Sequence, residues 1–268
     1  MSSAPTLDQE YLKREYRNAT NLNARIDLHQ RFSLNPYGWM HWIFDQLDLP
    51  PACRILELGC GPGTLWLENM DRIPQGWDIL LTDFSPGMLQ QVQENLAGKR
   101  LFQYKVVDAQ QMPLPYADGT FDALIANHMI YYIVDKPALF AEIRRVLTPG
   151  GRFYASTVGE KHLAELVDLI IRFDKKLASW QEGLESFSLE SAGGQIAKFF
   201  PDVQLRRYED GLAVTEVEPL LAYILSSKLD IEDERIPLLK KFLEDEMKRS
   251  GGIIRITKDS GIFCSSRT

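Results

Sequence analysis

The chain has 268 residues, of which 45% are hydrophobic and 25% charged, and its formal net charge is -7. This length and composition predict a globular protein with a substantial core, not a disordered chain. The negative charge, without any block rich in lysine or arginine, argues against nucleic acid as a partner, because a polyanionic backbone would be repelled.

The amino-terminal residues and the cysteines indicate the cellular compartment in which we expect the protein. Met1 to Pro5 lack the basic and apolar regions of a secretory signal, and no apolar run has the length needed to cross a membrane. Cys53, Cys60 and Cys264 are odd in number and lack metal-ligand spacing, which fits reduced thiols better than disulfides or zinc. We therefore expect a soluble, cytoplasmic protein without a metal site and without a membrane partner.

The first predicted elements are helical. Residues 8–47 have mostly helical patterning, and they belong to an amino-terminal helical segment over residues 1–50. Apolar residues at helical spacing mark the last helix of this segment, and we expect them to pack in the core: Trp39, Trp42, Ile43 and Leu47.

From residue 52 onward, short apolar strands alternate with helical segments, which is typical of a parallel sheet with helices on both faces. Two helices have clear starting signals, because Ser85 precedes a first-turn proline and Asp135 can cap a helix that stops at residues 149–151. Five strands are predicted: Arg54–Leu58, Asp78–Thr82, Leu101–Val107, Phe121–Ala126 and Gly151–Ser156.

After the fifth strand the pattern diverges. An apolar helical face starts at Leu163, residues 203–208 alternate like a strand, and two helices over 218–227 and 237–248 form an insertion at about 215–250. Residues 252–264 contain Asp-Ser-Gly turn chemistry and are predicted to form a final hairpin or a bent strand. We expect one domain, with a cofactor-binding core over residues 52–157 and a carboxyl-terminal part over 158–268.

The strongest functional signal is the stretch from Ile55 to Gly63. An apolar strand runs into glycines 59, 61 and 63, and Asp83 lies twenty residues beyond the last glycine. Glycines allow a tight strand-to-helix turn and let backbone N–H groups approach a ligand closely. A carboxylate at the end of the next strand suits a ribose diol, since it accepts hydrogen bonds from both hydroxyls. These residues predict a nucleoside site.

The glycine spacing separates two cofactor classes. A nicotinamide fingerprint has the pattern G-x-G-x-x-G, and Thr64 stands where its third glycine should be. The loop here reads G-x-G-x-G and follows Glu57. In this it resembles motif I of class I S-adenosylmethionine-dependent methyltransferases, of the small-molecule UbiE or methyltransferase type 11 kind. A nicotinamide oxidoreductase is therefore the less favoured interpretation.

The resemblance continues beyond the loop and covers residues 52–157 most strongly. It includes the segment around Asp83, the pair Asp108-Ala109, and the strand motifs 121–127 and 147–153. The fold it implies is Rossmann-like: a doubly wound, mostly parallel seven-stranded sheet with an antiparallel last strand. S-adenosylmethionine is the implied cofactor, and the implied cofactor-binding residues are Glu57, Gly59, Cys60, Gly61, Gly63, Asp83, Phe84, Met88, Asp108, Ala109 and Asn127.

The resemblance also suggests roles for single residues. Asp83 would hold the ribose, Phe84 and Met88 would flank the adenine, and Asp108 would accept a hydrogen bond from the exocyclic amine. Cys60, inside the glycine loop, is interpreted as a small space-filling residue, because no partner base is evident nearby.

The implied reaction is in-line transfer of a methyl group to a small organic acceptor, whose reacting atom (N, O, S or C) stays open. Of the four histidines, His128 is best placed, directly after the fourth strand, to act as a base or to contact the acceptor. The sequence 127–130 lacks the Asn-Pro-Pro-aromatic motif of enzymes that methylate amino groups of nucleic acids, which again argues against DNA or RNA.

Two segments are candidate lids over the site: the amino-terminal segment with Arg31, Tyr37 and Trp39, and the insertion at about 215–250. Two other functions stay open. One is a noncatalytic S-adenosylmethionine-binding or scaffold protein, and the other is a methyltransferase that acts on a protein or on tRNA with the help of a partner. The oligomeric state is likewise left open.

Overall fold

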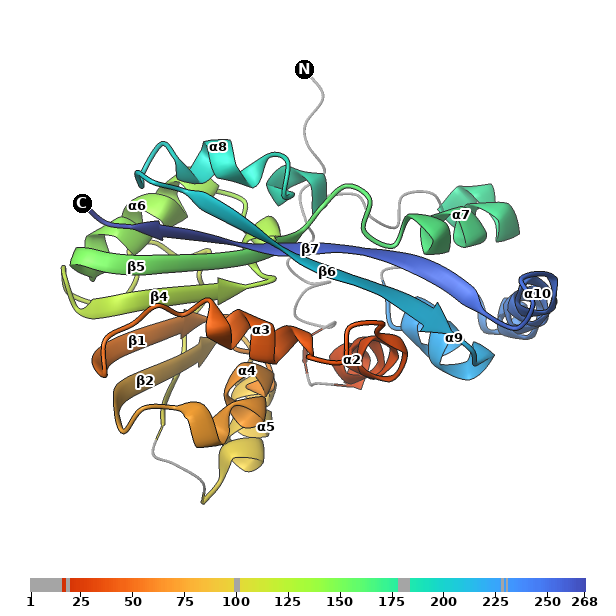
Figure 1. Ribbon diagram of the computed structural model, residues 1–268, viewed down its shortest axis with the longest axis horizontal. Helices are drawn as coiled ribbons and strands as arrows, with labels where there is room; N and C mark the ends of the chain where they lie inside the picture. Colours follow the sequence, from red (N-terminus) through yellow and green to blue (C-terminus); the bar gives the residue numbers. More distant parts are fainter. Residues whose placement is uncertain (1–15, 18–19, 99–101, 178–183, 228, 230) are drawn as a thin grey trace.

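The computed structural model describes residues 16–17, 20–98, 102–177, 184–227, 229 and 231–268. Seven strands form one sheet in the order β3-β2-β1-β4-β5-β7-β6 (Figure 1). Strands β1 to β5 pair in parallel, and β7 runs antiparallel to both β5 and β6. The predicted fold class is confirmed. The strands are β1 Ala52–Leu58, β2 Gly76–Asp83, β3 Gln103–Val106, β4 Phe121–Asn127, β5 Leu147–Val158, β6 Gln204–Val214 and β7 Ile254–Ser266.

Helices cover both faces of the parallel part because successive strand residues point to opposite sides. In β1, Ile55 packs in one core, with helices α3 (Trp39–Asp45), α4 (Thr64–Glu68) and α5 (Pro86–Leu96). Leu56 packs in the core on the other face, with helices α6 (Lys136–Val146) and α8 (Ala192–Ile196). Short 3-10 helices lie at η1 Met70–Arg72, η2 Ile130–Tyr132, η4 Leu184–Phe187 and η5 Asp233–Arg235.

Both predicted helix caps are present. The Ser85 hydroxyl accepts a hydrogen bond from the Met88 N–H at 3.2 Å, and the Asp135 carboxylate accepts one from the Ala138 N–H at 2.9 Å. The predicted end of the second helix was too late. Helix α6 ends at Val146, because Leu147 already pairs with β4 and begins β5.

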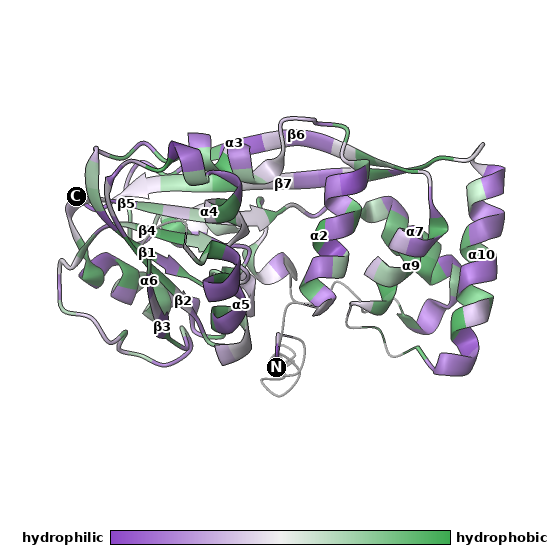
Figure 2. Cartoon of the chain, turned by 90° about the horizontal axis from the view of Figure 1, so that it is seen from below, coloured by the Kyte–Doolittle hydropathy of each residue, from purple (hydrophilic) through white to green (hydrophobic). Residues whose placement is uncertain are grey.

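A third core lies beyond the parallel strands, where β6 and β7 continue as a long two-stranded ribbon. Helices α2 (Thr20–Phe32), α7 (Ala164–Phe173), α9 (Val217–Leu225) and α10 (Ile236–Arg249) pack around this end. Figures 1 and 2 show these four helices together at one end of the molecule. The amino-terminal segment and the insertion, which the sequence presents as separate lids, thus share one hydrophobic core.

The predicted final hairpin is wrong, and the alternative of a single bent strand applies. Asp259 and Ser260 do not turn the chain; they pair with Glu209 and Tyr208 in the middle of β6. A Cβ at residue 261 would come 2.6 Å from the backbone oxygen of Arg206, so the glycine there permits close strand approach.

Other predicted elements agree in type and differ in length. The predicted helical segment 8–47 contains α2 and α3, while residues 8–15 and 18–19 lie outside the described part of the chain, as does Leu101 of the predicted third strand. None of the described helices has both the length and the apolar composition needed to cross a bilayer.

Candidate functional site

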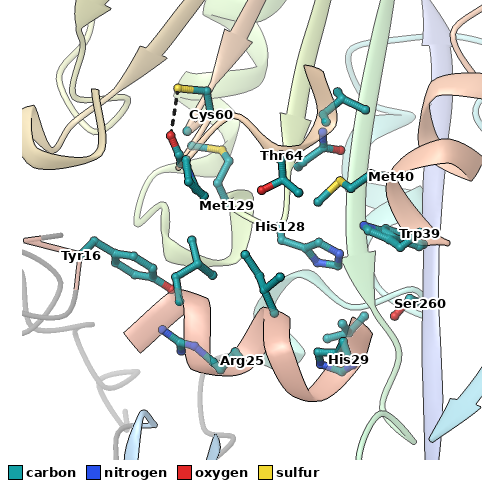
Figure 3. Close-up of a pocket in the computed structure, with 18 of the residues that line it drawn as sticks. Tyr16, Arg25, His29, Trp39, Met40, Cys60, Thr64, His128, Met129 and Ser260 are labelled. Atoms are coloured by element: carbon teal, nitrogen blue, oxygen red, sulfur yellow. Dashed lines mark hydrogen bonds between the residues drawn. The ribbon is translucent and has the colours of Figure 1, made fainter. Parts of the chain in front are cut away.

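A cavity of about 600 Å³ opens at the carboxyl ends of β1, β2 and β4. This volume is ordinary for a small-molecule site, and the position is where parallel α/β sheets bind ligands. Helix α2 lies across from the strand ends, and its Arg25 and His29 point toward the cavity (Figure 3). The site therefore has one wall from the parallel sheet and another from the helical end of the molecule.

The glycine loop bends with positive φ angles of 67° at Gly59 and 52° at Gly61, and both residues line the cavity. Gly63 has a φ of 77° but does not line the cavity. A Cβ on Gly63 would come 2.3 Å from Cγ2 of Val92 in α5, so this glycine is needed for helix packing beneath the loop. Two of the three predicted loop glycines are thus placed for ligand contact.

Asp83 is buried at the end of β2 and is held by the backbone. One carboxylate oxygen accepts a hydrogen bond from the Gly61 N–H at 3.1 Å, and the other accepts one from the Ser85 N–H at 2.9 Å. Burial nevertheless raises the pKa of Asp83 to about 6. Each oxygen keeps a further lone pair, which is what a ribose diol requires. Phe84 and Met88 also line the cavity.

Glu57 lies beneath the loop, almost fully buried. Trp66 Nε1 donates a hydrogen bond to one of its oxygens at 2.5 Å, and Asn127 Nδ2 donates to the other at 3.3 Å. Burial raises the pKa of this carboxyl to about 7. Both Glu57 and Asn127 line the cavity, so this buried acid offers charge to a cationic group of a ligand.

The remaining predicted cofactor residues also line the cavity. Asp108 accepts a hydrogen bond from the Gln110 N–H at 2.9 Å, and the adjacent Ala109 is buried. The thiol of Cys60 contacts the Gly61 backbone oxygen at 3.6 Å, and burial raises its pKa well above the ordinary value. A thiol of this kind is a poor nucleophile, which agrees with a space-filling role.

Tyr16 and Tyr132 line the cavity near Phe84. Their hydroxyl oxygens lie 2.5 Å apart, and the Tyr16 ring meets Phe84 edge to face at 6.4 Å between ring centroids. The amino-terminal segment thereby contacts the strand-end residues directly. Of the three predicted gating residues, Trp39 lines the cavity, whereas Arg31 does not and is paired with Glu216.

Tyr37, the third predicted gating residue, donates its hydroxyl to Asp45 at 2.6 Å and does not line the cavity. The insertion does reach the site, because Tyr223 and Ser227 near the end of α9 line it. Residues of both predicted lids therefore line the cavity.

His128 follows β4 with a left-handed φ of 48°. The backbone N–H of His128 donates to the backbone oxygen and to the hydroxyl oxygen of Ser156, each at 3.2 Å. The imidazole ring lies 5.3 Å from the Trp39 ring, measured between ring centroids. Burial and the charge of Lys258 lower the pKa of this imidazole to about 4. His128 is therefore neutral at physiological pH.

Four further residues of the cavity were not found from the sequence: His29, His162, Tyr223 and Lys258. His29 stacks on His162, with 6.1 Å between the ring centroids, and meets Tyr223 edge to face at 5.8 Å. They come from α2, the turn before α7, α9 and β7, and none belongs to a motif. Although three histidines meet here, no group of three His, Cys, Asp or Glu side chains within the described residues is arranged to hold a metal ion.

Known proteins resemble the chain over this same region. Residues 56–155 match the family model described as a methyltransferase domain. A malonyl-[acyl-carrier protein] O-methyltransferase from Geobacter sulfurreducens is 34% identical over 113 residues, which are 42% of this chain and 41% of the relative. The UbiE ubiquinone/menaquinone biosynthesis C-methyltransferase of Desulfotalea psychrophila is 31% identical over 114 residues, 42% of this chain and 45% of the relative.

These matches span less than half the length of either relative. Among solved structures, phosphoethanolamine N-methyltransferase 2 from Haemonchus contortus, in complex with S-adenosyl-L-methionine, has a TM-score of 0.60. It is 19% identical, and the likeness covers 97% of this chain and 59% of that one, which shows the shared fold. The chain therefore carries a class I S-adenosylmethionine-dependent methyltransferase domain at residues 56–155, with S-adenosylmethionine as its cofactor.

Proposed function

We propose that the protein transfers the methyl group of S-adenosylmethionine to a small organic acceptor. The observation that carries this proposal is the extent of the cavity, which continues from Gly59 and Asp83 past His128 to Tyr223 and Lys258. A protein that only bound the cofactor would have no need of a lined space beyond it. The relatives support the proposal, because their names describe methylation of a malonyl group on acyl-carrier protein and a methylation step in quinone biosynthesis.

In this proposal the strand-end residues hold the cofactor. Asp83 accepts hydrogen bonds from the ribose hydroxyls, Asp108 accepts one from the adenine amine, and Glu57 lies beside the charged methionine part. Gly59 bends the loop with a φ of 67°, and it is needed beside Met129, because a Cβ on residue 59 would come 3.1 Å from Cβ of Met129. In this proposal the acceptor takes the rest of the cavity, which His128, Tyr223 and Lys258 line.

S-adenosylmethionine supplies a methyl carbon to which the acceptor's lone pair bonds, while the methyl–sulfur bond breaks and its electron pair stays on sulfur to give S-adenosylhomocysteine. The contribution of the protein is to align the acceptor with that bond and to keep water out. Alignment of this kind is worth about 7 to 11 kcal/mol in well-oriented systems. A dedicated base is required only where the acceptor atom must lose a proton.

His128 contacts the acceptor in this proposal. Its pKa of about 4 makes it a weak base, so we expect it to act chiefly as a neutral hydrogen-bond partner. His128→Ala should therefore lower kcat by about tenfold, the equivalent of one neutral hydrogen bond, and leave the Kd for S-adenosylhomocysteine unchanged. His128→Gln should recover part of kcat. Steady-state kinetics with an acceptor found by screening would measure this, and unchanged kcat in His128→Ala would remove the residue from the reaction.

The first test of the function is calorimetric titration of the purified protein with S-adenosylhomocysteine and, separately, with NADH. We expect saturable binding of the first alone. Incubation with methyl-labelled S-adenosylmethionine and a panel of small carboxylic, phenolic, amine and thiol acceptors should then give a labelled product. Binding of S-adenosylhomocysteine without transfer to any acceptor, including proteins and tRNA of a cell extract, would favour a noncatalytic binding protein.

The buried acids make cofactor binding depend on pH. In the free protein the pKa of Asp83 is about 6 and that of Glu57 about 7, both raised by burial, so both carboxyls bind protons at about pH 5. Ribose hydroxyls and a cationic amine favour the ionised carboxylates, so binding releases protons. The affinity for S-adenosylhomocysteine should rise from about pH 5 through the pKa of both acids and level off only at about pH 8.

Calorimetry in buffers of different ionisation enthalpy measures this proton release directly. Glu57→Gln is the matched control, and it should abolish the part of the pH dependence nearest to pH 7. An affinity that stays constant across this range in the unmodified protein would contradict ionisation of both acids on binding.

A further inference from the structure

The ionisable residues that line the cavity are separated by charge. The described acidic residues of the lining all lie on the side of the parallel sheet and α4: Glu57, Glu68, Asp83 and Asp108. The opposite wall is lined by Arg25 and His29 of α2, His162 of the turn before α7 and Lys258 of β7, and His128, which follows β4, also lines the cavity. The cofactor residues proposed above include three of these acids, and the fourth, Glu68, accepts a hydrogen bond from Gln30 of α2. This leaves a basic wall without an assigned ligand.

Lys258 gives this wall its charge. Its side chain is 7% exposed and forms an ion pair with Asp210, whose side chain is fully buried and does not line the cavity. Asp210 also accepts hydrogen bonds from the Ser33 hydroxyl and from the backbone N–H of Leu34, which follow α2. A buried ion pair of this kind presents its positive end to the cavity and its negative end to the protein.

The positive end acts on the histidines. Burial and then the charge of Lys258 lower the pKa of His29, to about 3, and that of His128, to about 4. The pKa of His162 is lowered by burial, by the two other histidines and by Lys258. Arg25, on the same helix as His29, acts in the same direction. The potential at this end of the cavity is therefore positive.

We infer that the methyl acceptor carries an anionic oxygen group, a carboxylate or a phosphate, which binds between α2 and β7 beside Lys258, His29 and His162. This inference rests on the proposed methyl transfer and names the class of its acceptor. A cationic acceptor would meet like charge here, whereas an anion gains charge-assisted hydrogen bonds in a buried site.

The His162 ring can donate a hydrogen bond to such a group. Its Nδ1 accepts a hydrogen bond from the backbone N–H of Asp259 at 3.2 Å, so the neutral ring carries its proton on Nε2. Tyr223, packed against His29, adds a hydroxyl from α9. An anion bound here would also offset the positive potential and raise the pKa of the neighbouring histidines toward its ordinary value.

The test compares small aromatic ligands that differ in charge, and two of them, benzoate and benzamide, are matched in shape. The protein, with and without S-adenosylhomocysteine, is titrated with benzoate, benzamide and phenyl phosphate. We expect benzoate or phenyl phosphate to bind at least about tenfold more tightly than benzamide, and the tighter of the two anions shows whether the site takes a carboxylate or a phosphate. Equal binding of benzoate and benzamide, with phenyl phosphate no tighter, would overturn the inference.

Nuclear magnetic resonance of the histidine rings gives a second readout that needs no variant. The chain has four histidines, and His41 lies outside the cavity, where it is bonded to Asn69. The bound anion should raise the pKa of His29 or His162, and the signals of the His41 ring should be the same with and without the anion. Because His128 and Lys258 act on both rings, Arg25 acts on His29, and His29 acts on His162, a pH titration of each signal is compared with and without the anion. Identical titration curves would contradict an anion site here.

The double variant Lys258→Met, Asp210→Asn removes the ion pair without leaving a buried charge unpaired. It should weaken anion binding at least about tenfold and leave S-adenosylhomocysteine affinity unchanged. Lys240→Met is the matched control, because Lys240 pairs with Glu218 on the surface. Retained anion affinity in the folded double variant would overturn the inference. If S-adenosylhomocysteine fails to bind while the anion preference persists, the proposed cofactor contacts fail and the anion site stands.

Discussion

Replacing Asp210 with alanine should lower the free energy of unfolding by about 3 to 5 kcal/mol. Its fully buried carboxylate accepts hydrogen bonds from the Ser33 hydroxyl at 2.6 Å and from the N–H groups of Leu34 and Asn35 at 3.0 Å each, and it pairs with Lys258. The substitution leaves a buried ammonium and several buried donors without their acceptor, and each loss is costly. Urea denaturation followed by circular dichroism would measure the change.

Two controls separate this effect from ordinary loss of a charge. Asp245→Ala removes a carboxylate that pairs with Lys241 on the surface of α10, and it should change stability far less than Asp210→Ala. Asp210→Asn keeps one acceptor oxygen and should cost less than Asp210→Ala. The same stability for Asp210→Ala and the unmodified protein would show that the carboxylate does not anchor the chain after α2 to β6.

Asp83→Ala should weaken the binding of S-adenosylhomocysteine by about a hundredfold. Two hydrogen bonds from ribose hydroxyls to a carboxylate are worth about 3 kcal/mol together, which corresponds to roughly that factor in Kd. Because Asp83 also accepts the Gly61 N–H, its removal loosens the glycine loop that lies beside it. Calorimetric titration of the folded variant measures the loss.

Asp78→Ala is the matched control for this prediction. Asp78 lies in the same strand, β2, but it faces solvent, accepts a hydrogen bond from Gln103 and does not line the cavity. Its substitution should leave the affinity unchanged. An Asp83→Ala variant that folds normally and binds S-adenosylhomocysteine as tightly as the unmodified protein would remove Asp83 from the cofactor site.

The two predicted lids show where local sequence reasoning stops. The amino-terminal segment and the insertion each have apolar helical faces, and each was predicted as a candidate lid over the site. Leu28 of α2 and Leu220 of α9 instead belong to one buried core that also contains residues of β6 and β7. A helical pattern predicts that one face of a helix is buried. It does not indicate which element packs against that face, because that element lies far away in the chain.

The strand β7 gives the same lesson for turn signals. Asp259-Ser260-Gly261 has the residue types of a tight turn. Such residues are favoured in turns because Asp and Ser side chains bond to the nearby backbone and Gly adopts backbone angles that other residues avoid. In the folded chain all three pair with β6, and Ser260 and Gly261 also pair with β5 on the other side. Ladder hydrogen bonds to two neighbouring strands outweigh the preference of three residues.

The sequence by itself determined the alternation of strands and helices, both helix caps, the glycine loop and the acids Asp83 and Asp108, because each depends on residues close together in the chain. The tertiary structure alone decided the opposite wall of the cavity. There Ser33 meets Asp210, 177 residues away, and His162 meets Asp259, 97 residues away. Such contacts leave no periodic pattern or motif, since they arise when separate elements pack together, and packing depends on the whole chain.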